Sequence, residues 1–395
     1  MFRLTTLALA LGVSSSALAD PLSTILKDGT VSGNVDLRYE NVAQDNALDD
    51  ANAFTVRTRI AFKTGAYEGW SALVEMEDNR IVLGQGDYSV PPTGYQTGVH
   101  SVIADPEHTE LDQGFIQYTG DAITFKLGRQ VIVHDGQRHI GHVGWRHDRQ
   151  TFDGASVVFQ AESGLKAQYQ FIDQRNRIFA EAADIDSEDH LFHLSYPTTV
   201  GNLSAYRYML KTATSTTNGI DTTGVRLAGK QAHGENTFMY QLEFAQQKNT
   251  SGETNIESHY TLVELGYNVN GITAKVGYEL LGSDDGAGAF ASPLATLHKF
   301  NGWSDQFLGT PAEGLMDVYA VVAGKVLGGN WLLKYHDFSA DEATSTVDDL
   351  GTELNVQYVK KVSNTTKIGV KYANYEAGDI KFDTDKLWVW ANVSF

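Results

Sequence analysis

Residues 54–62 read FTVRTRIAF, and the stretch alternates between apolar and polar side chains. The apolar residues share one face of an extended strand, namely Phe54, Val56, Ile60 and Phe62. The polar residues share the other face, namely Thr55, Arg57 and Arg59. The 3.6-residue repeat of an α-helix does not fit this spacing. The stretch therefore predicts a β-strand with one apolar and one polar face.

The same alternation recurs along the chain in roughly 18 segments of about ten residues, the length that a tilted membrane strand needs. The expected strands cover 30–42, 52–64, 68–80, 109–119, 121–133, 151–161, 164–174, 188–197, 201–213, 219–231, 236–248, 257–269, 271–281, 314–327, 329–339, 350–361, 365–376 and 384–395. They predict an all-β protein, and two architectures fit: a soluble sandwich or a transmembrane antiparallel barrel.

The lengths of the connections distinguish these two architectures. Short turns alternate with long polar loops, which are expected at 43–51, 81–108, 134–150, 175–187, 212–218, 249–256, 282–313 and 340–349. Outer-membrane barrels have short periplasmic turns and long extracellular loops, whereas a sandwich does not sort its loops so regularly. We therefore expect a barrel in the outer membrane of a Gram-negative bacterium, surrounded by lipid and lipopolysaccharide.

Both ends of the chain agree with export. Residues 1–19 have a single early charge, a short apolar run and Ala17-Leu18-Ala19, as in a secretory signal peptide. The mature protein, residues 20–395, is expected to be one domain. In the final segment TDKLWVWANVSF (384–395), one face is apolar and ends in Phe395. This segment resembles the C-terminal signal that the barrel assembly machinery reads in outer-membrane proteins.

The composition excludes several classes of protein. The chain has no cysteine, which rules out disulfides and thiolate metal sites. It carries 49 acidic against 30 basic residues, so nucleic acid is not an expected partner. No cofactor is expected. Acidic loop residues, such as Asp45, Asp49 and Asp50, predict either a solvated surface or divalent-cation bridges to lipopolysaccharide.

In a lipid-embedded barrel the polar face of each strand must line the lumen, because charges in hydrocarbon are costly. The expected lumen cations are Arg38, Arg57, Arg59, Lys126, Arg207, Arg226, Lys230, Lys275, Lys334 and Lys371. The expected lumen anions include Asp36, Glu40, Glu75, Glu77, Glu243, Glu264, Glu279, Asp317 and Glu353. Most of these charges are expected to pair across strands, around a polar, water-filled path.

Residues 128–150 read GRQVIVHDGQRHIGHVGWRHDRQ and concentrate histidines and arginines. The histidines His134, His139, His142 and His147 suggest a metal site, but the nearby arginines repel a divalent cation. A hydrolytic site lacks a serine in this stretch. A basic, hydrogen-bonding loop at the pore is the favoured interpretation, because arginine forks suit carboxylates. By alternation Arg129 points outward, unless a bulge at Gly128 turns it inward.

The long loop 282–313 is rich in aromatic and aliphatic residues. It is either a self-packed surface loop or a segment that folds into the mouth and narrows it. In the second case Trp303, Phe300 and Trp145 are candidates to line a constriction or to stack on a sugar ring.

Three segments resemble the alginate-export type of outer-membrane porin. They are LGRQ…QRHIGHVGWRHDRQTFDGA, then FASPLATLHKFNGWSDQFLGTPAEGLMDVYAVVAGKV at 290–326 with the following YHDFSAD, and the final TDKLWVW. The resemblance implies an 18-stranded barrel with inward-folding loops and a pore for anionic solutes such as uronate polymers. It also implies an arginine-rich constriction, whose role passes by position to Arg129, Arg138 and Arg146. Arg57, Arg59 and Lys126 follow as pore candidates from their lumen-facing phase alone.

The expected function is a passive channel for small anionic or sugar-derived solutes, acting by electrostatic focusing and without a covalent step. Two alternatives stay open. One is a dedicated uronate oligosaccharide or polysaccharide transporter, in either direction. The other is a barrel enzyme that acts on lipid or peptide.

Overall fold

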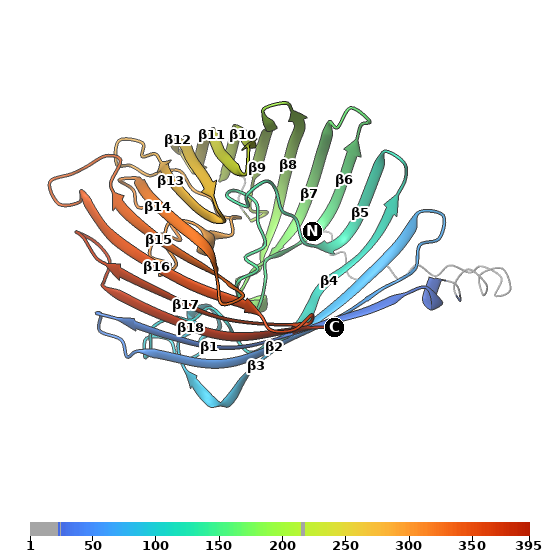
Figure 1. Cartoon of the computed structure of the whole chain (residues 1–395), viewed down its shortest axis with the longest axis horizontal. Helices are drawn as coiled ribbons and strands as arrows, with labels where there is room; N and C mark the ends of the chain where they lie inside the picture. The colour runs from blue at the N-terminus through green and yellow to red at the C-terminus, as the bar shows by residue number, and fades with distance from the viewer. Residues whose placement is uncertain (1–22, 24, 215–217) are drawn as a thin grey trace.

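A computed structural model describes residues 23, 25–214 and 218–395, and its dominant feature is an 18-stranded antiparallel sheet closed into a barrel (Figure 1). The predicted signal peptide, 1–19, lies outside the described residues. The strands are β1 (Thr30–Gln44), β2 (Ala51–Lys63), β3 (Trp70–Asp87), β4 (His108–Thr119), β5 (Ile123–Gln130), β6 (Thr151–Gln160), β7 (Lys166–Asn176), β8 (Ile185–Thr198), β9 (Gly201–Leu210), β10 (Gly219–His233), β11 (Asn236–Ser251), β12 (Thr254–Val269), β13 (Ile272–Leu281), β14 (Leu315–Val326), β15 (Gly329–Ser339), β16 (Asp349–Lys361), β17 (Thr366–Glu376) and β18 (Thr384–Ser394). The predicted fold class is confirmed.

Helical structure among the named elements is confined to three single 3₁₀ turns: η1 (Pro91–Thr93), η2 (Ala180–Ala183) and η3 (Leu297–Lys299). Among the described residues, no helix combines the length and the hydrophobicity that crossing a bilayer requires.

The barrel closes where the first strand meets the last. β1 pairs with β18 from Asn34 opposite Ser394 to Gln44 opposite Thr384. The terminal Phe395 exchanges backbone hydrogen bonds with Gly33, at N–O distances of 2.8 and 2.9 Å. Closure satisfies the backbone donors and acceptors that an open sheet edge would expose to lipid.

The outer face of the wall is apolar. Val225, Val276 and Val318 each expose more than half of their accessible surface, namely 53%, 60% and 51%. Moving such a side chain from water to an apolar medium contributes roughly 1.5–3 kcal/mol. Outward aromatic residues, among them Trp70, Tyr196 and Tyr267, lie near the short turns, as in the girdles of outer-membrane barrels. The outer face therefore matches the hydrocarbon layer.

Connection lengths alternate as the sequence predicts, with one exception. Residues 249–256, predicted as a long loop, are instead a strand hairpin in which β11 and β12 extend to a tight turn at 252–253. Gly252 occupies this turn with a φ of +63°, a conformation that costs glycine little. The longest connections are 88–107, 131–150 and 282–314, and they join β3 to β4, β5 to β6 and β13 to β14.

Candidate functional site

Two long connections, residues 131–150 and 282–314, fold together inside the barrel; we call them the inner loops. Ile140 and Leu294 form a parallel β-bridge between them. The Gly141 N–H donates to the Leu294 carbonyl at 2.7 Å, and the Thr296 N–H donates to the Gln137 carbonyl at 3.1 Å. Of the two alternatives for residues 282–313, the structure favours a segment that folds into the loop end of the barrel over a self-packed surface loop.

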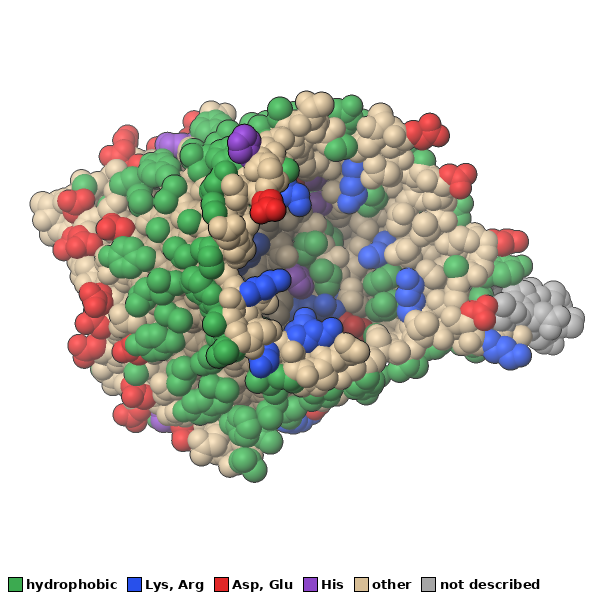
Figure 2. Space-filling view, viewed as in Figure 1, with side chains coloured by type: hydrophobic (Ala, Val, Ile, Leu, Met, Phe, Trp, Pro, Cys, Tyr) green, Lys and Arg blue, Asp and Glu red, His purple; other side chains and the backbone are tan. Residues whose placement is uncertain are grey.

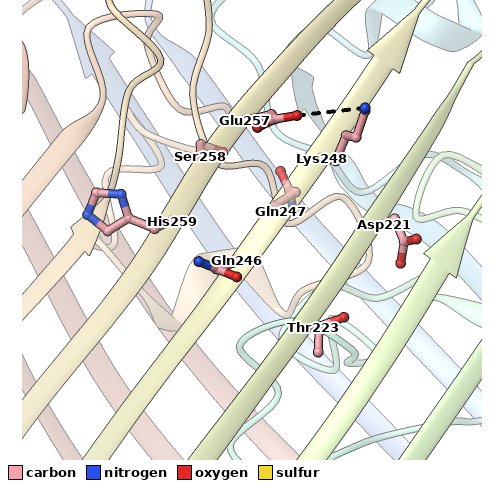
Figure 3. A pocket seen from close by; sticks show the side chains of 8 residues that line it. All are labelled: Asp221, Thr223, Gln246, Gln247, Lys248, Glu257, Ser258 and His259. Atoms are coloured by element: carbon pink, nitrogen blue, oxygen red, sulfur yellow. Dashed lines mark ion pairs between the residues drawn. The ribbon is translucent and has the colours of Figure 1, made fainter.

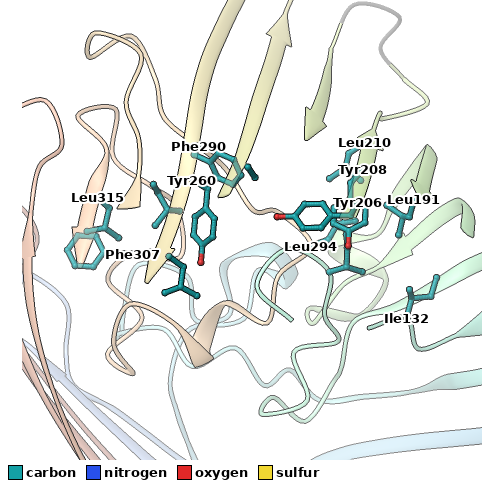
Figure 4. Packing of buried hydrophobic residues seen from close by; sticks show 14 of the residues in the cluster. Ile132, Leu191, Tyr206, Tyr208, Leu210, Tyr260, Phe290, Leu294, Phe307 and Leu315 are labelled. Carbon is teal, nitrogen blue, oxygen red and sulfur yellow. The ribbon is translucent and has the colours of Figure 1, made fainter. Parts of the chain in front are cut away.

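The inner loops adhere to the wall partly through a buried apolar cluster (Figure 4). Ile140, Phe290 and Leu294 from the loops are at most 1% exposed. They lie in one cluster with lumen-facing residues of the strands, including Tyr206 and Tyr208 of β9. The rings of Tyr206 and Tyr208 stack with centroids 4.7 Å apart. This part of the lumen is therefore a packed core and not open water.

The apolar filling corrects one sequence prediction. Arg207, expected in the lumen, lies on the outer face of β9 and pairs with Asp221, with an Nη2–Oδ2 distance of 2.6 Å. The inward positions of this strand are taken by Ser204, Tyr206 and Tyr208, which are buried. The rule that polar residues face inward fails here because an apolar loop, and not water, contacts the inner side of the strand.

Arg138 is buried and joins both inner loops to the wall. Its Nε donates to Glu279 Oε1 of β13 at 2.6 Å, and its Nη2 donates to Asn301 Oδ1 of the second inner loop at 3.0 Å. The guanidinium also lies 4.8 Å from the centroid of the Phe300 ring. The structure thus brings Arg138 and Phe300 together, but the arginine charge is engaged by the protein itself.

Arg146 has the same character. It is 4% exposed and donates to Glu40 of β1 at 2.8 Å, while Asp105 and Asp305 lie at 3.4 and 3.3 Å. Burial alone lowers the pKa of this guanidinium, but the surrounding carboxylates raise it above its ordinary value. Arg146 therefore stays charged and ties the first inner loop to three other segments.

Arg57 and Arg59 lie on the inner face of β2, as predicted, and both are nearly buried. Arg59 pairs with Glu77 of β3 and donates from Nη2 to the His147 carbonyl at 2.7 Å. Arg57 donates to Asn34, and no carboxylate oxygen of a described residue lies within 4.0 Å of it. Of the two, only Arg57 forms no direct ion pair with a described carboxylate.

Arg129 does not face the pore. Ile123 and Leu127 of β5 are 48% and 47% exposed on the outer face, and the pairings of β5 show no register shift before Arg129. The bulge at Gly128 that would have turned Arg129 inward is absent from these pairings, and Arg129 stays outward, as alternation predicts. It pairs with Asp153 of β6, with distances of 2.8 and 3.0 Å. The structure corrects the pore role predicted for Arg129: this residue lies on the outer wall, because the β alternation runs unbroken to it.

Trp145 and Trp303, predicted from different loops, surround one amine. The Lys371 Nζ of β17 lies 4.2 Å from the Trp145 ring centroid, 4.0 Å from Trp303 and 5.0 Å from Trp388. The same Nζ donates to His298 Nε2 at 2.6 Å. Both predicted tryptophans are half-buried, so each still presents part of its surface.

The four histidines of the first inner loop are dispersed among different partners. His134 bonds Gln170, His139 bonds Glu243, His142 bonds Gln137 and His147 bonds Thr55. Burial is the largest cause that lowers the pKa of His134 to about 3 and the pKa of His142 to about 4. These residues act as hydrogen-bonding anchors, and they do not gather into one ligand set.

A cavity of about 430 Å³ lies where the inner loops meet the loops that follow β3, β7 and β17. Its polar side holds Arg146, His298, Asp305 and Lys386, with Lys386 Nζ 3.0 Å from Asp305 Oδ2. Apolar residues such as Leu308 line the rest. Asp305 and Lys386 were not among the sequence candidates, because their neighbours are distant in the chain.

The opposite end of the lumen carries unpaired lysines. They lie at inward strand positions close to the short turns, and no carboxylate oxygen of a described residue is within 4.0 Å of their Nζ. We call them the mouth lysines, and they are Lys63, Lys126, Lys166, Lys230, Lys325, Lys361 and Lys367. Lys126, a predicted pore residue, lies 4.2 Å from the Phe115 ring centroid. Figure 2 shows Lys and Arg side chains on the wall of the hollow.

A second polar depression lies outside the pore. Asp221, Gln246, Lys248, Glu257 and His259 line it at the loop ends of β10–β12, and Lys248 points toward Glu257 at 3.7 Å (Figure 3). Alternation places these residues on the outer wall, since the intervening Thr222, Gln247 and Ser258 are buried. This groove faces the surroundings of the barrel and has no part in the constriction.

Solved structures with the same architecture are outer-membrane porins. OccK9 (OpdG) of Pseudomonas aeruginosa has a TM-score of 0.72 at 13% identity, over 94% of this chain and 99% of that one. OccAB1 of Acinetobacter baumannii has a TM-score of 0.72 at 12% identity, over 94% and 97%. OpdK of P. aeruginosa, solved with vanillate, has a TM-score of 0.69 at 16% identity, over 94% and 100%. At these identities the likeness shows the fold.

No curated protein sequence matches the chain. A family model described as alginate export matches residues 29–280, which is more than half of the chain and includes the first inner loop. Together with the closed barrel, this match places the chain in the outer membrane of a Gram-negative bacterium. The chain belongs to the alginate export family.

Proposed function

We propose that the protein is a passive porin-like channel for small anionic or sugar-derived solutes, with no covalent step. One observation carries the proposal: the inner-loop arginines Arg138 and Arg146 are paired with buried carboxylates, whereas the described mouth lysines have no carboxylate within 4.0 Å. Unbalanced cations on the wall of an aqueous passage attract anions and repel cations. Selectivity then comes from the lysines and Arg57, and the loop arginines set the shape of the constriction.

The neighbours support a small-solute role. OpdK was solved with vanillate, which carries a carboxylate, and the aligned fold covers nearly all of both chains. A carboxylate is the group that an ammonium-lined mouth attracts. The family model is described as alginate export and the similar solved structures are porins. Both matches support a channel over a barrel enzyme.

The test is the reversal potential of single channels in planar bilayers under a KCl gradient. The wild type is expected to prefer chloride. The triple variant Lys63→Gln/Lys126→Gln/Lys166→Gln is expected to lose most of that preference. The matched control, Lys248→Gln/Lys360→Gln, removes lysines from the outer side of the wall and is expected to leave selectivity unchanged. A cation-selective wild type would overturn the proposal.

A uronate oligosaccharide is the second candidate solute. Family membership and the half-buried rings of Trp145 and Trp303 favour it, because a sugar can stack on an aromatic face while its carboxylate meets a cation. Swelling of proteoliposomes in isosmotic galacturonate, its trimer and neutral galactose separates the candidates. Entry of the monomer but not the trimer supports a small-solute porin, whereas equal entry of both supports dedicated saccharide passage.

A further inference from the structure

A cluster of potential metal ligands lies at the lumen wall, outside the histidine-rich stretch. Glu77 of β3, His108 and Glu110 of β4, and Asp148 of the first inner loop each offer one ligand atom, and these atoms lie within 4.8 Å of one another. Among the described residues, no other group of histidines and carboxylates meets the same criterion. Glu77 and Asp148 are each 1% exposed.

The sheet register forces two of these carboxylates together. Glu77 lies directly opposite Glu110 in the β3–β4 pairing, and His108 is two residues before Glu110 on the same inward face. Like charges directly opposite each other destabilise a sheet, so this pair needs a compensating charge. Arg59 pairs with Glu77, but it is shared with Asp112 at 3.3 Å.

Asp148 adds a third carboxylate that is not satisfied. Its Oδ2 accepts from the Ala180 N–H at 2.8 Å, whereas its Oδ1 is buried and has no hydrogen-bond partner. A buried, unpartnered carboxylate oxygen is costly unless a cation binds it. A divalent ion would supply the positive charge that these three clustered carboxylates need, displacing the proton shared at His108.

His108 is oriented as a ligand. Its Nδ1 lies 3.0 Å from the Pro106 carbonyl, which selects the tautomer with the proton on Nδ1. Nε2 faces Glu77 Oε1 at 3.1 Å, where in the metal-free protein a protonated imidazole pairs with that carboxylate. A divalent ion would replace this proton and be held by both groups. A backbone carbonyl on the second imidazole nitrogen is the usual outer partner of a metal-bound histidine.

We propose that Glu77, His108, Glu110 and Asp148 bind one divalent ion that pins the first inner loop to the β3–β4 wall. In a tetrahedral site with bonds of about 2.0–2.2 Å the ligand atoms lie roughly 3.3–3.6 Å apart, so side chains of this cluster would move together by up to about 1.5 Å on binding. One imidazole with three carboxylates suits a first-row ion such as Zn²⁺ or Mn²⁺ over Ca²⁺. The bound ion would hold the end of the loop that carries Arg146 and His147.

The test compares metal content and channel behaviour. Folded barrel, purified in detergent and stripped with EDTA, is loaded with Zn²⁺, desalted and analysed for elemental zinc. The variant Glu110→Gln/Asp148→Asn keeps side-chain size but replaces one acceptor oxygen of each carboxylate with an NH₂ donor. The control Glu257→Gln/Asp285→Asn makes the same change at two exposed carboxylates. Both variants carry the same lipopolysaccharide, so ions bound to lipid cancel. Heat-modifiable migration on gels confirms that each barrel is folded.

Wild type and control are each expected to retain one more Zn²⁺ per barrel than the double variant. Loss of an outer partner alone weakens binding about 10–100-fold, so loss of two ligands should weaken it at least about tenfold. EDTA should release the first inner loop of wild type and add brief channel closures to its single-channel current records. The double variant should show these closures both with and without EDTA. Equal zinc in all three proteins would overturn the site. Binding of Ca²⁺ but not Zn²⁺ would overturn the assignment of His108 as a ligand.

Discussion

Arg138 and Glu279 form a buried ion pair that joins the first inner loop to β13, with an Nε–Oε1 distance of 2.6 Å. The same carboxylate accepts from Tyr260 Oη at 2.7 Å and from Asn301 Nδ2 at 2.8 Å. One glutamate therefore gathers a wall tyrosine and residues of both inner loops. This carboxylate therefore helps to hold both inner loops in place.

Removing Arg138 should release the first inner loop. Arg138→Met leaves Glu279 buried without its cation, at a cost of about 3–5 kcal/mol. We expect a larger mean conductance and faster tryptic cleavage within 131–150. Arg138→Met/Glu279→Gln should recover part of the loss, because no charge is stranded. The exposed-side control Arg129→Gln should leave conductance unchanged, and an equal effect of both arginines would contradict the assigned roles.

Lowering the pH should loosen the second inner loop. His298 is buried, and burial is the main cause that lowers its pKa to about 3 from an ordinary value of 6.5. Below pH 6.5 a released loop takes up a proton that the packed loop refuses, so the packed state loses stability as the pH falls toward 3. We expect more frequent opening steps in records at pH 4.5 than at pH 7.5.

The control for this prediction is His298→Asn, which cannot titrate. Its conductance should be altered at pH 7.5, because the bonds to Asp305 and Lys371 change, but its pH dependence should be flatter than in wild type. A variant that keeps the full pH dependence would assign the effect to other groups.

Loss of the Trp303 ring should weaken retention of saccharides. Trp303→Ala removes an aromatic face on which a sugar ring can stack, a contact worth about 1 kcal/mol, or roughly fivefold in residence time. The measurement is the duration of current blockades by oligogalacturonate. Trp303→Phe should retain most of the effect, whereas Trp70→Ala, at the outer girdle, should have none. Unchanged blockades in Trp303→Ala would remove Trp303 from the solute path.

Arg57 should contribute to anion preference while Arg59 should chiefly support packing. Arg57→Gln removes a lumen charge that is in no direct ion pair, and a shift in reversal potential toward cations is expected. Arg59→Gln strands the buried Glu77, so reduced stability is the larger effect. Reversal potentials and urea unfolding of the two variants, measured side by side, would show the contrast. Equal shifts in selectivity would contradict it.

Much of the barrel is readable from the sequence because the side-chain period of a strand is local. The alternation in FTVRTRIAF orients Arg57 and Arg59 inward without knowledge of any other strand, and the structure confirms it. The hairpin at 249–256 was missed, since polar strand ends that rise above the membrane resemble loops. Arg207 was misplaced because its strand faces a packed loop and not water.

The candidate site is less predictable, because charge balance depends on partners distant in the chain. The sequence by itself determined the strand number, the lipid face and the presence of a long arginine-rich loop, since each follows from alternation or composition over short windows. Only the tertiary structure decided that Arg138 meets Glu279, 141 residues away, that Arg146 meets Asp305, and that Arg129 stays outside. The physical reason is that an ion pair is fixed by where loops fold in space, which no local periodicity encodes.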